Sequence, residues 1–472
     1  MAGKKIIRKD FSSWLNDIID RAKILDIRYP IKGTYVWYPY GFRLRTNILK
    51  LLRKLLDGTG HEEALFPMLV PEEEFMKEAI HVKGFEDEVY WVTHGGLQEL
   101  NVKLALRPTS ETAIYPMYAL WIRAHSDLPL KLYQVVNTFR YETKATKPLI
   151  RLREITTFKE AHTAHSSYED AKKQVHEAIS VYKKFFDSLG IPYVITKRPE
   201  WDKFPGADYT IAFDTVLPDG KTLQIGTVHN LGTNFSKTFE MTFENLKGEQ
   251  EHVYQTCYGV SDRVIASHLG VHGDDKGLVL MPEVAPYQCI IVPILFKGKE
   301  RLVENATNKV LETLKDYRVY VDKTENTPGH KFYTGEMRGV PLRIEIGPRD
   351  VENKSAVLVR RDTGEKKTAS LDKIAIEIKA ELSKISADMK KNAWAELNAL
   401  INPAKTLDDA QKLLKTKQGI VKTEWCGEKD CGLNVEETLG VTLLGTTEET
   451  ANGECIGCGG TGKNVLLIAN AH

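Results

Sequence analysis

The first part of the chain has apolar residues at helical spacing, followed by short strand-like runs. Over residues 41–57 the apolar positions lie three and four apart, which predicts an amphipathic helix. The short apolar run HEEALFPMLVP follows, and its Pro67 favours an edge or terminating strand. Residues 167–190 predict a second helix that ends at Gly190. Helices and strands are therefore mixed in this region.

Most strand-like runs of this region follow one another across short polar turns. KLYQVVNTFRYE and LIRLREITTF flank the polar loop TKATKP and predict a long hairpin. After residue 190 come the runs DYTIAFDTVL, KTLQIGTVHNLG, KTFEMTFEN and HVYQTCYGVS. Parallel strands would need crossover helices, so these turns predict an antiparallel sheet and exclude a doubly wound nucleotide fold for the first 280 residues.

The pattern changes near residue 284. The strand-like runs QCIIVPIL, RVYVDKT, PLRIEIG and AVLVRRD alternate with helical stretches near 298–315, 330–338 and 371–386. From about residue 388 the chain is helical and lysine-rich, and it then passes through a cysteine cluster to the strand NVLLIA. We expect three domains: an α+β domain on an antiparallel sheet (1–283), a mixed α/β domain (284–387) and a small α+β domain (388–472).

Composition limits the classes of function. The chain has 472 residues, of which 42% are hydrophobic and 27% charged, as in ordinary globular proteins. Its net charge of +1 excludes nucleic-acid binding by a positive field of the whole molecule, so such a site must be a local patch. There is no run of eighteen apolar residues and no apolar stretch in MAGKKIIRKDFSSW. We expect no membrane contact and a cytoplasmic location.

Four cysteines crowd into two close pairs near the end of the sequence. Four residues separate the first two, and the last two form a Cys-Ile-Gly-Cys knuckle: Cys426, Cys431, Cys455 and Cys458. Four thiolates can enclose Zn²⁺ in a tetrahedron with no open position for water, so the pattern predicts a structural zinc site. Two unrelated pairs of free thiols are the alternative. Cys257 and Cys289 stand alone in apolar runs and are expected in the core.

Two glycine-rich stretches imitate phosphate-binding motifs. GCGGTGKN at 457–464 has suitable glycine spacing, but Asn464 replaces the required Ser or Thr, and no strand and helix frame it. PDGKT at 218–222 lacks the upstream glycine, because Thr215 occupies that position. We reject both as phosphate loops and expect the second to be a hairpin turn.

The long hairpin carries a concentration of arginine. By strand alternation, Arg140 and Glu142 share one face, as do Arg151 and Arg153 across the loop. Arginine binds phosphate or carboxylate in bidentate fashion, so this cluster favours an anion site. A solvated face, balanced by Glu142, Glu154 and Glu160, is the alternative.

A further arginine, Arg263, lies between an apolar strand and the start of an apolar helix. An arginine there needs an anion to offset the cost of its desolvation. An ion pair with Asp262 or another nearby carboxylate is the alternative explanation.

These segments resemble a known family. The first helix with the Pro67 strand, FRYE...RLRE and GVSDRVIAS are similar, in order and spacing, to motifs 1, 2 and 3 of class II aminoacyl-tRNA synthetases. LRPTSET, FPGADYT, QIGTVHNLGTNFSKTFE, VHGDDKGLVLMPEVAPYQ, PGHKFYTGEMRGVPLRIEIGPRD, VRRDTGEKKT and WCGEKDC resemble prolyl-tRNA synthetases in particular. The likeness covers nearly the whole chain and points to the archaeal and eukaryote-like type, which lacks the large editing insertion of many bacterial forms.

The resemblance implies both a reaction and a set of site residues. Proline would be joined to ATP with release of pyrophosphate, and the prolyl group would then pass to the 3′ end of tRNA(Pro). Arg140 and Arg263 would be catalytic. Proline would be held by Thr109, Glu111, Arg140, Phe158, Phe204 and His229. ATP with Mg²⁺ would be held by Arg140, Glu142, Arg151, Gln224, Thr227 and Arg263. Phe158 and His229 have the alternative of being ordinary core residues.

The resemblance also assigns the domains and the partners. Residues 1–283 would be the catalytic domain, 284–387 the anticodon-binding domain and 388–472 a zinc-binding domain. The anticodon would be read near Glu345, Arg349, Arg360 and Arg361, for which solvated surface charge is the alternative. A homodimer is expected, since members of this group are typically dimers through motif 1.

Two other functions fit part of the pattern. The first is a class II synthetase for another small amino acid, such as threonine or cysteine. Threonine selection in the related family uses a zinc with one cysteine and two histidines, and no such ligand pattern is evident in this core. Cysteine is close to proline in volume and is discriminated poorly by an apolar pocket, so misactivation of cysteine belongs with this reading. The second is a non-catalytic tRNA-binding paralogue, which is expected to have lost Glu111, Arg140 or Arg263.

Overall fold

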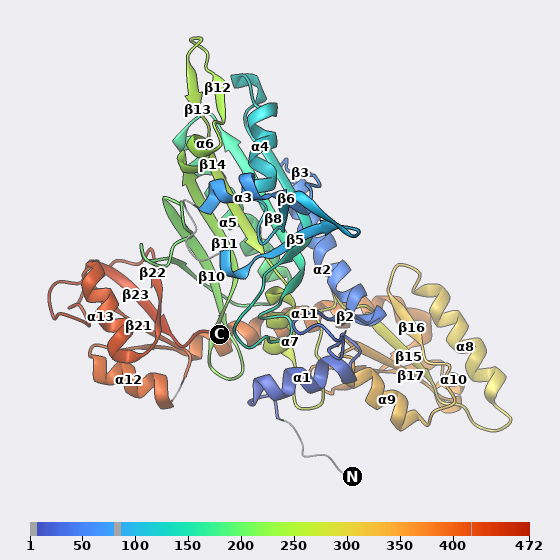
Figure 1. The fold of residues 1–472 in the computed structure, drawn as a ribbon. Coiled ribbons are helices and arrows are strands. Elements are labelled where there is room, and N and C mark those ends of the chain that lie inside the picture. Colours follow the sequence, from blue (N-terminus) through green and yellow to red (C-terminus); the bar gives the residue numbers. More distant parts are fainter. Residues whose placement is uncertain (1–6, 80–85, 417) are drawn as a thin grey trace.

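Three units of the chain lie side by side in the computed structural model, which describes residues 7–79, 86–416 and 418–472 (Figure 1). A large sheet forms the centre, a smaller sheet with its helices lies on one side, and the cysteine-containing unit lies on the other. Residues 1–6, part of the sequence start expected to lack a signal peptide, are outside the described residues.

The first unit contains most of the helices. They are α1 (Phe11–Arg21), α2 (Pro39–Asp57), α3 (Glu72–Ala79), α4 (Glu111–Trp121), α5 (Tyr168–Ser188), α6 (Asn234–Thr238) and α7 (Arg263–His272), with the 3₁₀ turns η1 (Glu86–Glu88) and η2 (His125–Asp127). The expected helix over 167–190 is confirmed as α5, and Gly190 follows it with the positive φ of a helix C-cap.

The strands of this unit form a large sheet and three small ones. They are β1 (Leu25–Asp26), β2 (Val36–Trp37), β3 (Glu62–Glu63), β4 (Leu69–Pro71), β5 (Tyr90–Gly95), β6 (Gln98–Leu106), β7 (Leu130–Phe139), β8 (Glu154–His165), β9 (Val194–Lys197), β10 (Tyr209–Val216), β11 (Thr222–Gly232), β12 (Thr242–Glu244), β13 (Gln250–His252) and β14 (Tyr254–Val260). Strands β9, β10, β11, β14, β8 and β7 are neighbours in that order and all pair antiparallel, which confirms the prediction.

Helices cover one face of the central sheet. Buried side chains of α1, α2, α5 and α7 pack there in one apolar cluster with Phe213 of β10 and Val228 of β11. Burying an aliphatic or aromatic side chain of this size contributes about 1.5–3 kcal/mol. On the opposite face, α4 and α6 cover only one end of the sheet, through a second cluster around Tyr115 and Phe235. The rest of that face is available for a pocket.

The second unit is mixed α/β, as predicted. It contains β15 (Cys289–Pro293), α8 (Glu300–Thr313), β16 (Val319–Val321), α9 (Pro328–Met337), β17 (Leu342–Ile346), α10 (Pro348–Glu352), β18 (Ser355–Arg360), β19 (Lys366–Ser370) and η3 (Leu371–Lys373). The strand order is β16-β15-β17-β18-β19, in which β15 is parallel to β16 and β17 and the remaining pairs are antiparallel.

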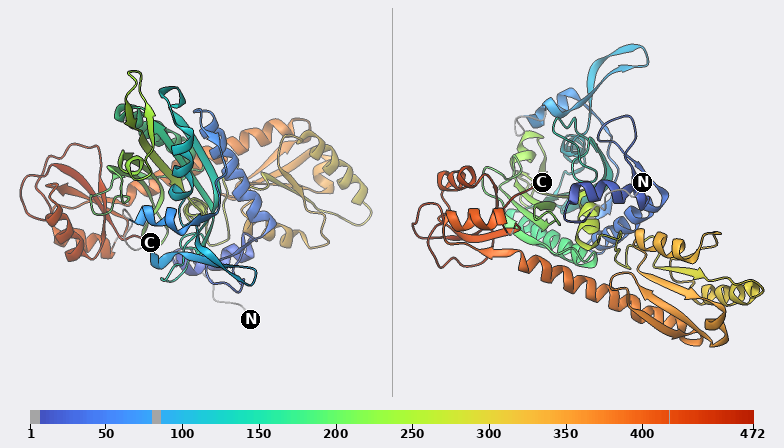
Figure 2. Two further views of the ribbon diagram at one scale, coloured as in Figure 1. Left: turned by 45° about the horizontal axis from the view of Figure 1, so that its top comes forward. Right: turned by 90° about the horizontal axis from the view of Figure 1, so that it is seen from below.

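A single long helix joins the second and third units. The helix expected over about 371–386 is in fact α11 (Ile374–Ala399), and the expected domain boundary at 388 falls inside it. The predicted end was wrong because buried Met389, Ala393 and Leu397 continue the apolar stripe at a spacing of four. The helix runs along one edge of the molecule (Figure 2).

The third unit extends the central sheet. It contains β20 (Ile401–Pro403), α12 (Leu407–Thr416), β21 (Ile420–Trp425), α13 (Lys429–Leu439), β22 (Thr442–Thr446) and β23 (Asn464–Ala469). Strand β22 meets β9 through the single pair Thr446 and Lys197, so the combined sheet has eleven strands in the order β20-β21-β23-β22-β9-β10-β11-β14-β8-β7-β3. Across residues 7–79, 86–416 and 418–472, none of the helices has both the length and the apolar character needed to cross a bilayer.

One cation lies in the core beneath the central sheet. Lys159 of β8 has 0% exposure, and its Nζ lies 3.2 Å from the Tyr182 hydroxyl and 3.3 Å from the Tyr258 carbonyl oxygen. The rings of the same two tyrosines flank it. Burial lowers the pKa of its ammonium group from 10.5 to about 7.

The buried lysine predicts a pH-dependent term in stability. The unfolded chain keeps the proton of Lys159 up to about pH 10, whereas the folded chain releases it near pH 7, so folding gains stability as pH rises between these values. In Lys159→Met this term is absent. We expect the free energy of unfolding of the unaltered protein to rise relative to the variant by roughly 1 kcal/mol per pH unit between about pH 7 and 9.

Thermal or urea unfolding at several pH values measures this difference. Lys172→Met, at an exposed position of α5, is the matched control and should show no pH-dependent difference. A Lys159→Met difference that is constant with pH would contradict the prediction.

Candidate functional site

A cavity of about 590 Å³ opens on the face of the central sheet that α5 and α7 leave free. The residues that sequence analysis expected to bind proline or ATP all line it, namely Thr109, Glu111, Arg140, Glu142, Arg151, Phe158, Phe204, Gln224, Thr227, His229 and Arg263. Their individual roles stay predictions at this point. What the structure adds is how each side chain is brought there.

Alternation along two strands supplies the floor of the cavity. On β8, Phe158 and Glu160 face the cavity while Lys159 between them faces the core. On β14, Cys257 lines the cavity while the neighbouring Tyr258 belongs to the core cluster. The floor therefore combines an aromatic ring, a carboxylate and a thiol.

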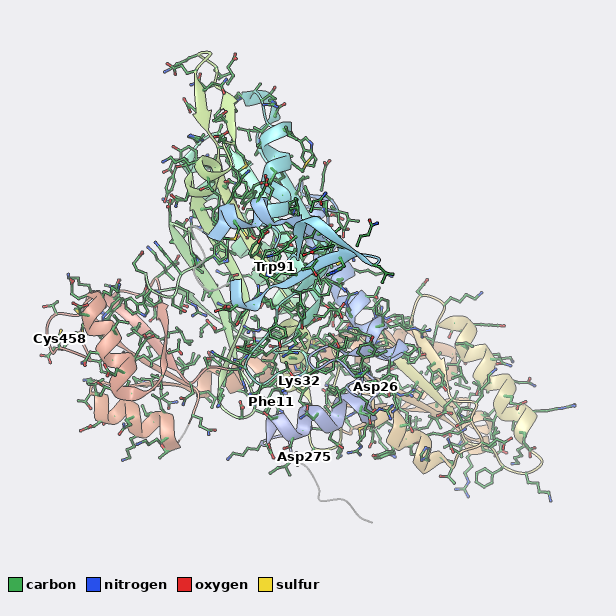
Figure 3. All side chains as sticks on the ribbon, viewed as in Figure 1. Phe11, Asp26, Lys32, Trp91, Asp275 and Cys458 are labelled. Atoms are coloured by element: carbon green, nitrogen blue, oxygen red, sulfur yellow. The ribbon has the colours of Figure 1, made fainter. Side chains whose placement is uncertain are left out.

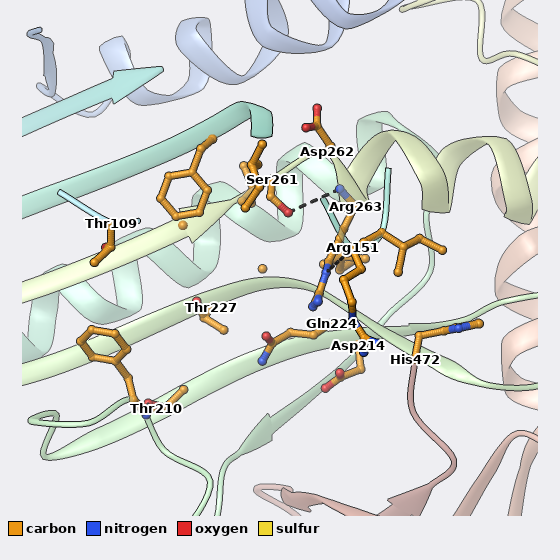
Figure 4. A pocket seen from close by; sticks show the side chains of 18 of the residues that line it. Thr109, Arg151, Thr210, Asp214, Gln224, Thr227, Ser261, Asp262, Arg263 and His472 are labelled. Carbon is orange, nitrogen blue, oxygen red and sulfur yellow. Dashed lines mark hydrogen bonds between the residues drawn. The ribbon is translucent and has the colours of Figure 1, made fainter. Parts of the chain in front are cut away.

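A β-bulge directs two further side chains into the cavity. Strand β10 pairs Phe213 with Gly226 and then Asp214 with Gln224, so Ile225 is an extra residue on β11. Ile225 packs in the core. Gln224 and Thr227 are three positions apart and would point to opposite faces of a regular strand. Because of the bulge, both side chains line the cavity. Figure 4 shows both side chains beside Arg151 and Arg263.

The hairpin arginines do not lie in strands, which corrects the alternation argument. Strand β7 ends at Phe139 and β8 begins at Glu154, so residues 140–153 form an irregular connection. Arg140 and Arg151 still reach the cavity from it. Arg140 donates through Nε to the Pro108 carbonyl at 3.2 Å.

Arg153 is directed away from the cavity. Its guanidinium lies 4.5 Å from the centre of the Tyr141 ring and donates to the Glu142 carbonyl at 3.2 and 3.3 Å. It therefore does not pair with Glu154 or Glu160.

The segment around Gly33 supports the connection through its backbone. The Arg153 backbone N–H donates to the Gly33 carbonyl at 2.9 Å. Gly33 has φ +81°, and a Cβ there would lie 2.8 Å from Thr146. The segment around Gly33 thus braces the connection.

Three cations crowd one end of the cavity. Burial together with the charges of Arg140 and Arg151 lowers the pKa of the Arg263 guanidinium to about 10. Arg263 donates through Nε to the Ile150 carbonyl at 3.1 Å, while Arg151 lies 3.9 Å from Glu142. Asp262 instead accepts from the Thr156 N–H at 2.8 Å, so the expected alternative pairing of Arg263 with Asp262 is not formed. Mutually repelling cations of this kind favour an anionic ligand.

The opposite end of the cavity carries buried carboxylates. The hydroxyl of Thr109 donates to Glu111. Glu160 accepts from Ser110 and from the Gln134 amide at 3.0 Å. Burial alone would raise the pKa of Glu160, but its hydrogen bonds and the nearby His162 outweigh burial and lower it. This end suits a ligand cation.

Two aromatic side chains form part of the cavity wall. The rings of Phe204 and His229 lie 4.8 Å apart, and His229 Nδ1 lies 2.8 Å from the Thr210 hydroxyl oxygen. Burial and then the charge of His162 lower the pKa of His229 to about 3, so its imidazole is neutral near pH 7. This wall is apolar on its face and suits a small ring.

Sequence analysis missed an ion pair in the cavity wall. Arg198 donates to Asp214 at 2.9 Å and to the Leu444 carbonyl of β22. Both side chains are buried, and the pair ties β10 to the third unit. No local pattern reveals it, because Arg198 and Leu444 are 246 positions apart.

The third unit also contributes His472, another residue that sequence analysis left unassigned. Its imidazole has 1% side-chain exposure and lies 3.1 Å from Asp219 in the β10–β11 turn. The Lys147 amine of the β7–β8 connection is 3.3 Å from the other ring nitrogen. Figure 4 shows His472 beside the arginine end of the cavity. His472 therefore links two loops that border the cavity.

The four clustered cysteines meet as predicted. Their sulfur atoms all lie within 4.8 Å of one another, and those of Cys431 and Cys455 are 3.5 Å apart. A Cβ added at Gly457 would lie 2.6 Å from the Cys431 sulfur, so the knuckle needs this glycine. The donor set fits Zn²⁺ with four thiolates and no open position. Cys458 marks the site, far from the centre of the molecule (Figure 3).

The residues expected to read an anticodon have unequal exposure. Arg349 is exposed on α10. Glu345 is 8% exposed and accepts from Arg343 at 2.9 Å. Sequence analysis missed Arg343, which also contacts Glu336 at 3.1 Å and lies 4.2 Å from the centre of the Phe332 ring.

Arg360 and Arg361 are buried in ion pairs. Arg360 donates to Asp362 at 2.6 and 3.0 Å and to Asp388 at 2.8 Å. Arg361 donates to both oxygens of Asp274 at 2.7 and 2.8 Å, which connects the second unit to the first. Neither guanidinium has the exposure that contact with a base requires.

The core also holds a group of possible metal ligands that the sequence did not reveal. Glu111, His162 and Cys257 are buried, and their ligand atoms lie within 4.8 Å of one another. This set differs from the pattern of one cysteine and two histidines that a threonine-selecting site would need. Their elements, α4, β8 and β14, are far apart in sequence.

Comparison with family models matches each unit. The class II core domain of tRNA synthetases (G, H, P, S and T) matches residues 90–272. An anticodon-binding domain matches residues 288–381. The C-terminal domain of prolyl-tRNA synthetases matches residues 407–472. The predicted fold class, a class II core followed by an α/β anticodon-binding domain and a small C-terminal domain, is thereby confirmed.

Curated relatives and solved structures agree with the family models. The chain is 57% identical over 452 residues to the proline–tRNA ligase of Methanothermobacter thermautotrophicus, covering 95% of this chain and 93% of that protein. It is 56% identical over 446 residues to that of Methanocaldococcus jannaschii, covering 94% and 98%. Giardia lamblia prolyl-tRNA synthetase in complex with prolyl-adenylate has a TM-score of 0.96 at 37% identity and 99% coverage of both chains. The Cryptosporidium parvum enzyme complexed with halofuginone and AMPPNP has a TM-score of 0.93 at 33% identity and 98% coverage of both.

The contacts of His472 predict an effect on loop mobility. Replacing it in His472→Ala removes its links to Lys147 and Asp219, each of the order of 1 kcal/mol. We expect roughly fivefold faster amide hydrogen exchange in residues 144–150 and 217–221, measured by mass spectrometry.

The control for this experiment is a histidine that makes no such link. His176→Ala, at an exposed position of α5, should leave exchange in both loops unchanged. Unchanged exchange in His472→Ala would show that the loops hold their positions without this side chain.

Proposed function

The chain belongs to the prolyl-tRNA synthetase family, and we propose on that premise that its cavity joins L-proline to ATP and then transfers the prolyl group to tRNA(Pro). The observation that carries this proposal is that one cavity combines an arginine end and a carboxylate end with the aromatic pair Phe204 and His229 in its wall. The enzyme is a proline–tRNA ligase in this reading. The alternatives, another small amino acid or a non-catalytic paralogue, have no comparable support, since the relatives above are named as ligases for proline.

Proline is held at the carboxylate end. Its secondary ammonium group faces Glu111, which Thr109 orients, and charge-assisted hydrogen bonds fix its position. The pyrrolidine ring lies against the wall of Phe204 and His229, with Phe158 on the floor. Because His229 is neutral, it adds no positive charge beside the substrate ammonium.

ATP lies across the arginine end. Arg140 contacts the α-phosphate and the proline carboxylate, which meet between the two ends of the cavity. Arg151 and Arg263 hold the outer phosphates with Mg²⁺, and Glu142 accepts from the adenine amino group. Gln224 and Thr227 complete the nucleotide site. Proline carboxylate attacks the α-phosphate, and pyrophosphate leaves. Arginines fixed before the reaction stabilise the charge that develops in this step, which is often the largest catalytic contribution.

Transfer to tRNA uses the same cavity and the surfaces beside it. The acceptor end approaches across the β7–β8 connection, whose loop TKATKP borders the cavity. Residues 284–387 bind the anticodon loop. There we propose that Glu345 and Arg349 contribute to base recognition together with Arg343 and Phe332, because an exposed arginine and a stacked guanidinium suit unstacked guanine bases. For Arg360 and Arg361 we propose a structural role in place of base contact.

The third unit, residues 388–472, holds a structural Zn²⁺. Cys426, Cys431, Cys455 and Cys458 supply the ligands, and the metal would order the loops that carry them. Strand β22 and His472 of the same unit line the cavity. The zinc unit therefore supports the catalytic site without supplying a reacting group.

We propose a cytoplasmic homodimer, as the family resemblance implies. Large apolar side chains are exposed near the edge strands β3 and β4 and at the end of α4, including Leu65 at 80%, Leu120 at 58% and Trp121 at 47%. Large exposed apolar side chains such as these are frequent at subunit contacts. Sedimentation as a monomer at micromolar concentration would contradict the dimer.

Proline activation is tested by ATP–pyrophosphate exchange with each of the twenty amino acids. We expect exchange that depends on proline. Glu111→Gln should raise the KM for proline about 30–100-fold, because it loses a charge-assisted bond of about 2–3 kcal/mol. Arg263→Lys should instead lower kcat about 100-fold or more, with little change in the KM for proline.

Glu169→Gln, at an exposed position of α5, also removes one carboxylate charge and is the matched control. It should catalyse ATP–pyrophosphate exchange at the rate of the unaltered protein. Absence of proline-dependent exchange in the unaltered protein would overturn the function. If Glu111→Gln and Arg263→Lys changed the KM for proline and kcat to the same extent, the roles assigned to Glu111 and Arg263 would be wrong.

The zinc site predicts one equivalent of metal and a metal-dependent unit. Chelation of the metal, or Cys455→Ser, should lower the melting temperature of the third unit by roughly 10 °C or more, because metal binding supplies part of its folding energy. Metal analysis and calorimetry measure both effects. Adding Zn²⁺ to the chelated protein should restore the melting temperature of the third unit, whereas adding Mg²⁺ should not. Much less than one equivalent of zinc would count against the site.

A further inference from the structure

Three potential metal ligands meet beneath the proline end of the cavity. Glu111 comes from α4, His162 from β8 and Cys257 from β14, and their ligand atoms all lie within 4.8 Å of one another. Carboxylate, imidazole and thiolate groups are each ligands of Zn²⁺, and zinc sites with three protein ligands keep one position open. This cluster is separate from the four cysteines of the third unit.

Two of the three ligands are oriented by contacts behind them. The Thr109 hydroxyl donates to Oε2 of Glu111, and Oε1 of Glu111 lies 3.7 Å from the Cys257 sulfur. The Tyr115 hydroxyl lies 3.0 Å from Nδ1 of His162, and Oε2 of Glu160 lies 3.4 Å from its Nε2, so a metal bound at Nε2 replaces the contact with Glu160. Ligands with this kind of outer support bind a metal 10–100-fold more tightly than ligands without it.

The cluster opens into the cavity. Glu111 and Cys257 both line it, together with Phe158 and His229. A cation bound to the three ligands would have its fourth position toward the space assigned to proline. It would also occupy the carboxylate that the substrate ammonium needs. Metal and proline are therefore mutually exclusive at this place.

We propose that Glu111, His162 and Cys257 form a second, lower-affinity site for Zn²⁺ or a similar thiophilic divalent cation, which competes with proline. The inference rests on the proposed function for the identity of the competing substrate. On binding, the sulfur of Cys257 exchanges its proton for the metal, and that proton passes to solvent. No oxidation or reduction takes place.

The number of thiolates sets the order in which the two sites fill. Tetrahedral zinc with bonds of about 2.0–2.3 Å holds its ligand atoms roughly 3.3–3.8 Å apart. Both clusters contain a pair at this spacing, 3.5 Å between the sulfurs of Cys431 and Cys455 and 3.7 Å between the Cys257 sulfur and Oε1 of Glu111. Because soft thiolate ligands favour Zn²⁺ over carboxylate ligands, the first equivalent fills the four-cysteine site and the second enters the cavity.

Spectroscopy on the full chain tests the site. Protein carrying one equivalent of Zn²⁺ is titrated with Co²⁺, whose bond to a thiolate gives a charge-transfer band. We expect a band that saturating proline abolishes. Cys257→Ser should lose it, and Cys289→Ser, which alters another buried cysteine, should keep it. A band that persists in Cys257→Ser, or that proline leaves unchanged, would overturn the proposal.

Calorimetry of proline binding without ATP is the second arm, and it needs no variant. Zn²⁺ at nine times its own dissociation constant should weaken apparent proline binding tenfold, as simple competition requires. Proline binding that is independent of Zn²⁺ would overturn the proposal even if Cys257→Ser fails to fold. Complete absence of proline binding would instead count against the proposed function, while the Co²⁺ band still decides whether the metal site exists.

Discussion

The structure depends above all on holding several arginine side chains together in a buried place. Burial, and then the charges of Arg140 and Arg151, lower the pKa of the Arg263 guanidinium. Folding must oppose this repulsion before any ligand arrives. The chain does so with backbone carbonyls, which accept from Arg140 and Arg263 and fix both guanidinium groups. An anionic ligand such as a polyphosphate would offset the repulsion among these arginines, whose positions are already fixed before it binds.

The surrounding elements serve to keep that arrangement rigid. The central sheet supplies a floor whose core face is sealed by four helices. The bulge at Ile225 shifts the register of β11 so that Gln224 and Thr227 both reach the cavity. The segment around Gly33 and the side chain of His472 hold the β7–β8 connection through hydrogen bonds. Positions in the cavity are thus set in part by segments that lie far from the connection in the sequence.

Sequence reasoning recovered what is local or what a motif carries. The family resemblance of LRPTSET and of the segments around it selected Phe158, Thr109 and Glu111, and all three line the cavity. Alternation failed for Arg153 because it assumes an unbroken strand, whereas the chain leaves the sheet at Phe139. The end of α11 was missed because its stripe continues at the same spacing past the expected domain boundary.

Long-range pairings were beyond sequence reasoning for a different reason. The Leu444 carbonyl that accepts from Arg198 and the Asp274 carboxylate that accepts from Arg361 lie in other units, and a single sequence contains no signal that links such positions. The same holds for Glu111, His162 and Cys257, which only the sheet brings together.

The way the cavity is assembled has a consequence for the order in which the protein becomes functional during its own synthesis. The strands that carry most of the cavity, β7 to β14, are complete by residue 260, so they can pair while the rest of the chain is still being made. The wall formed by β22 and His472 comes from residues made more than 180 positions later. Until then the cavity lacks this wall. We therefore expect a nascent chain of this protein to hold an assembled but unsealed cavity until its last unit has docked.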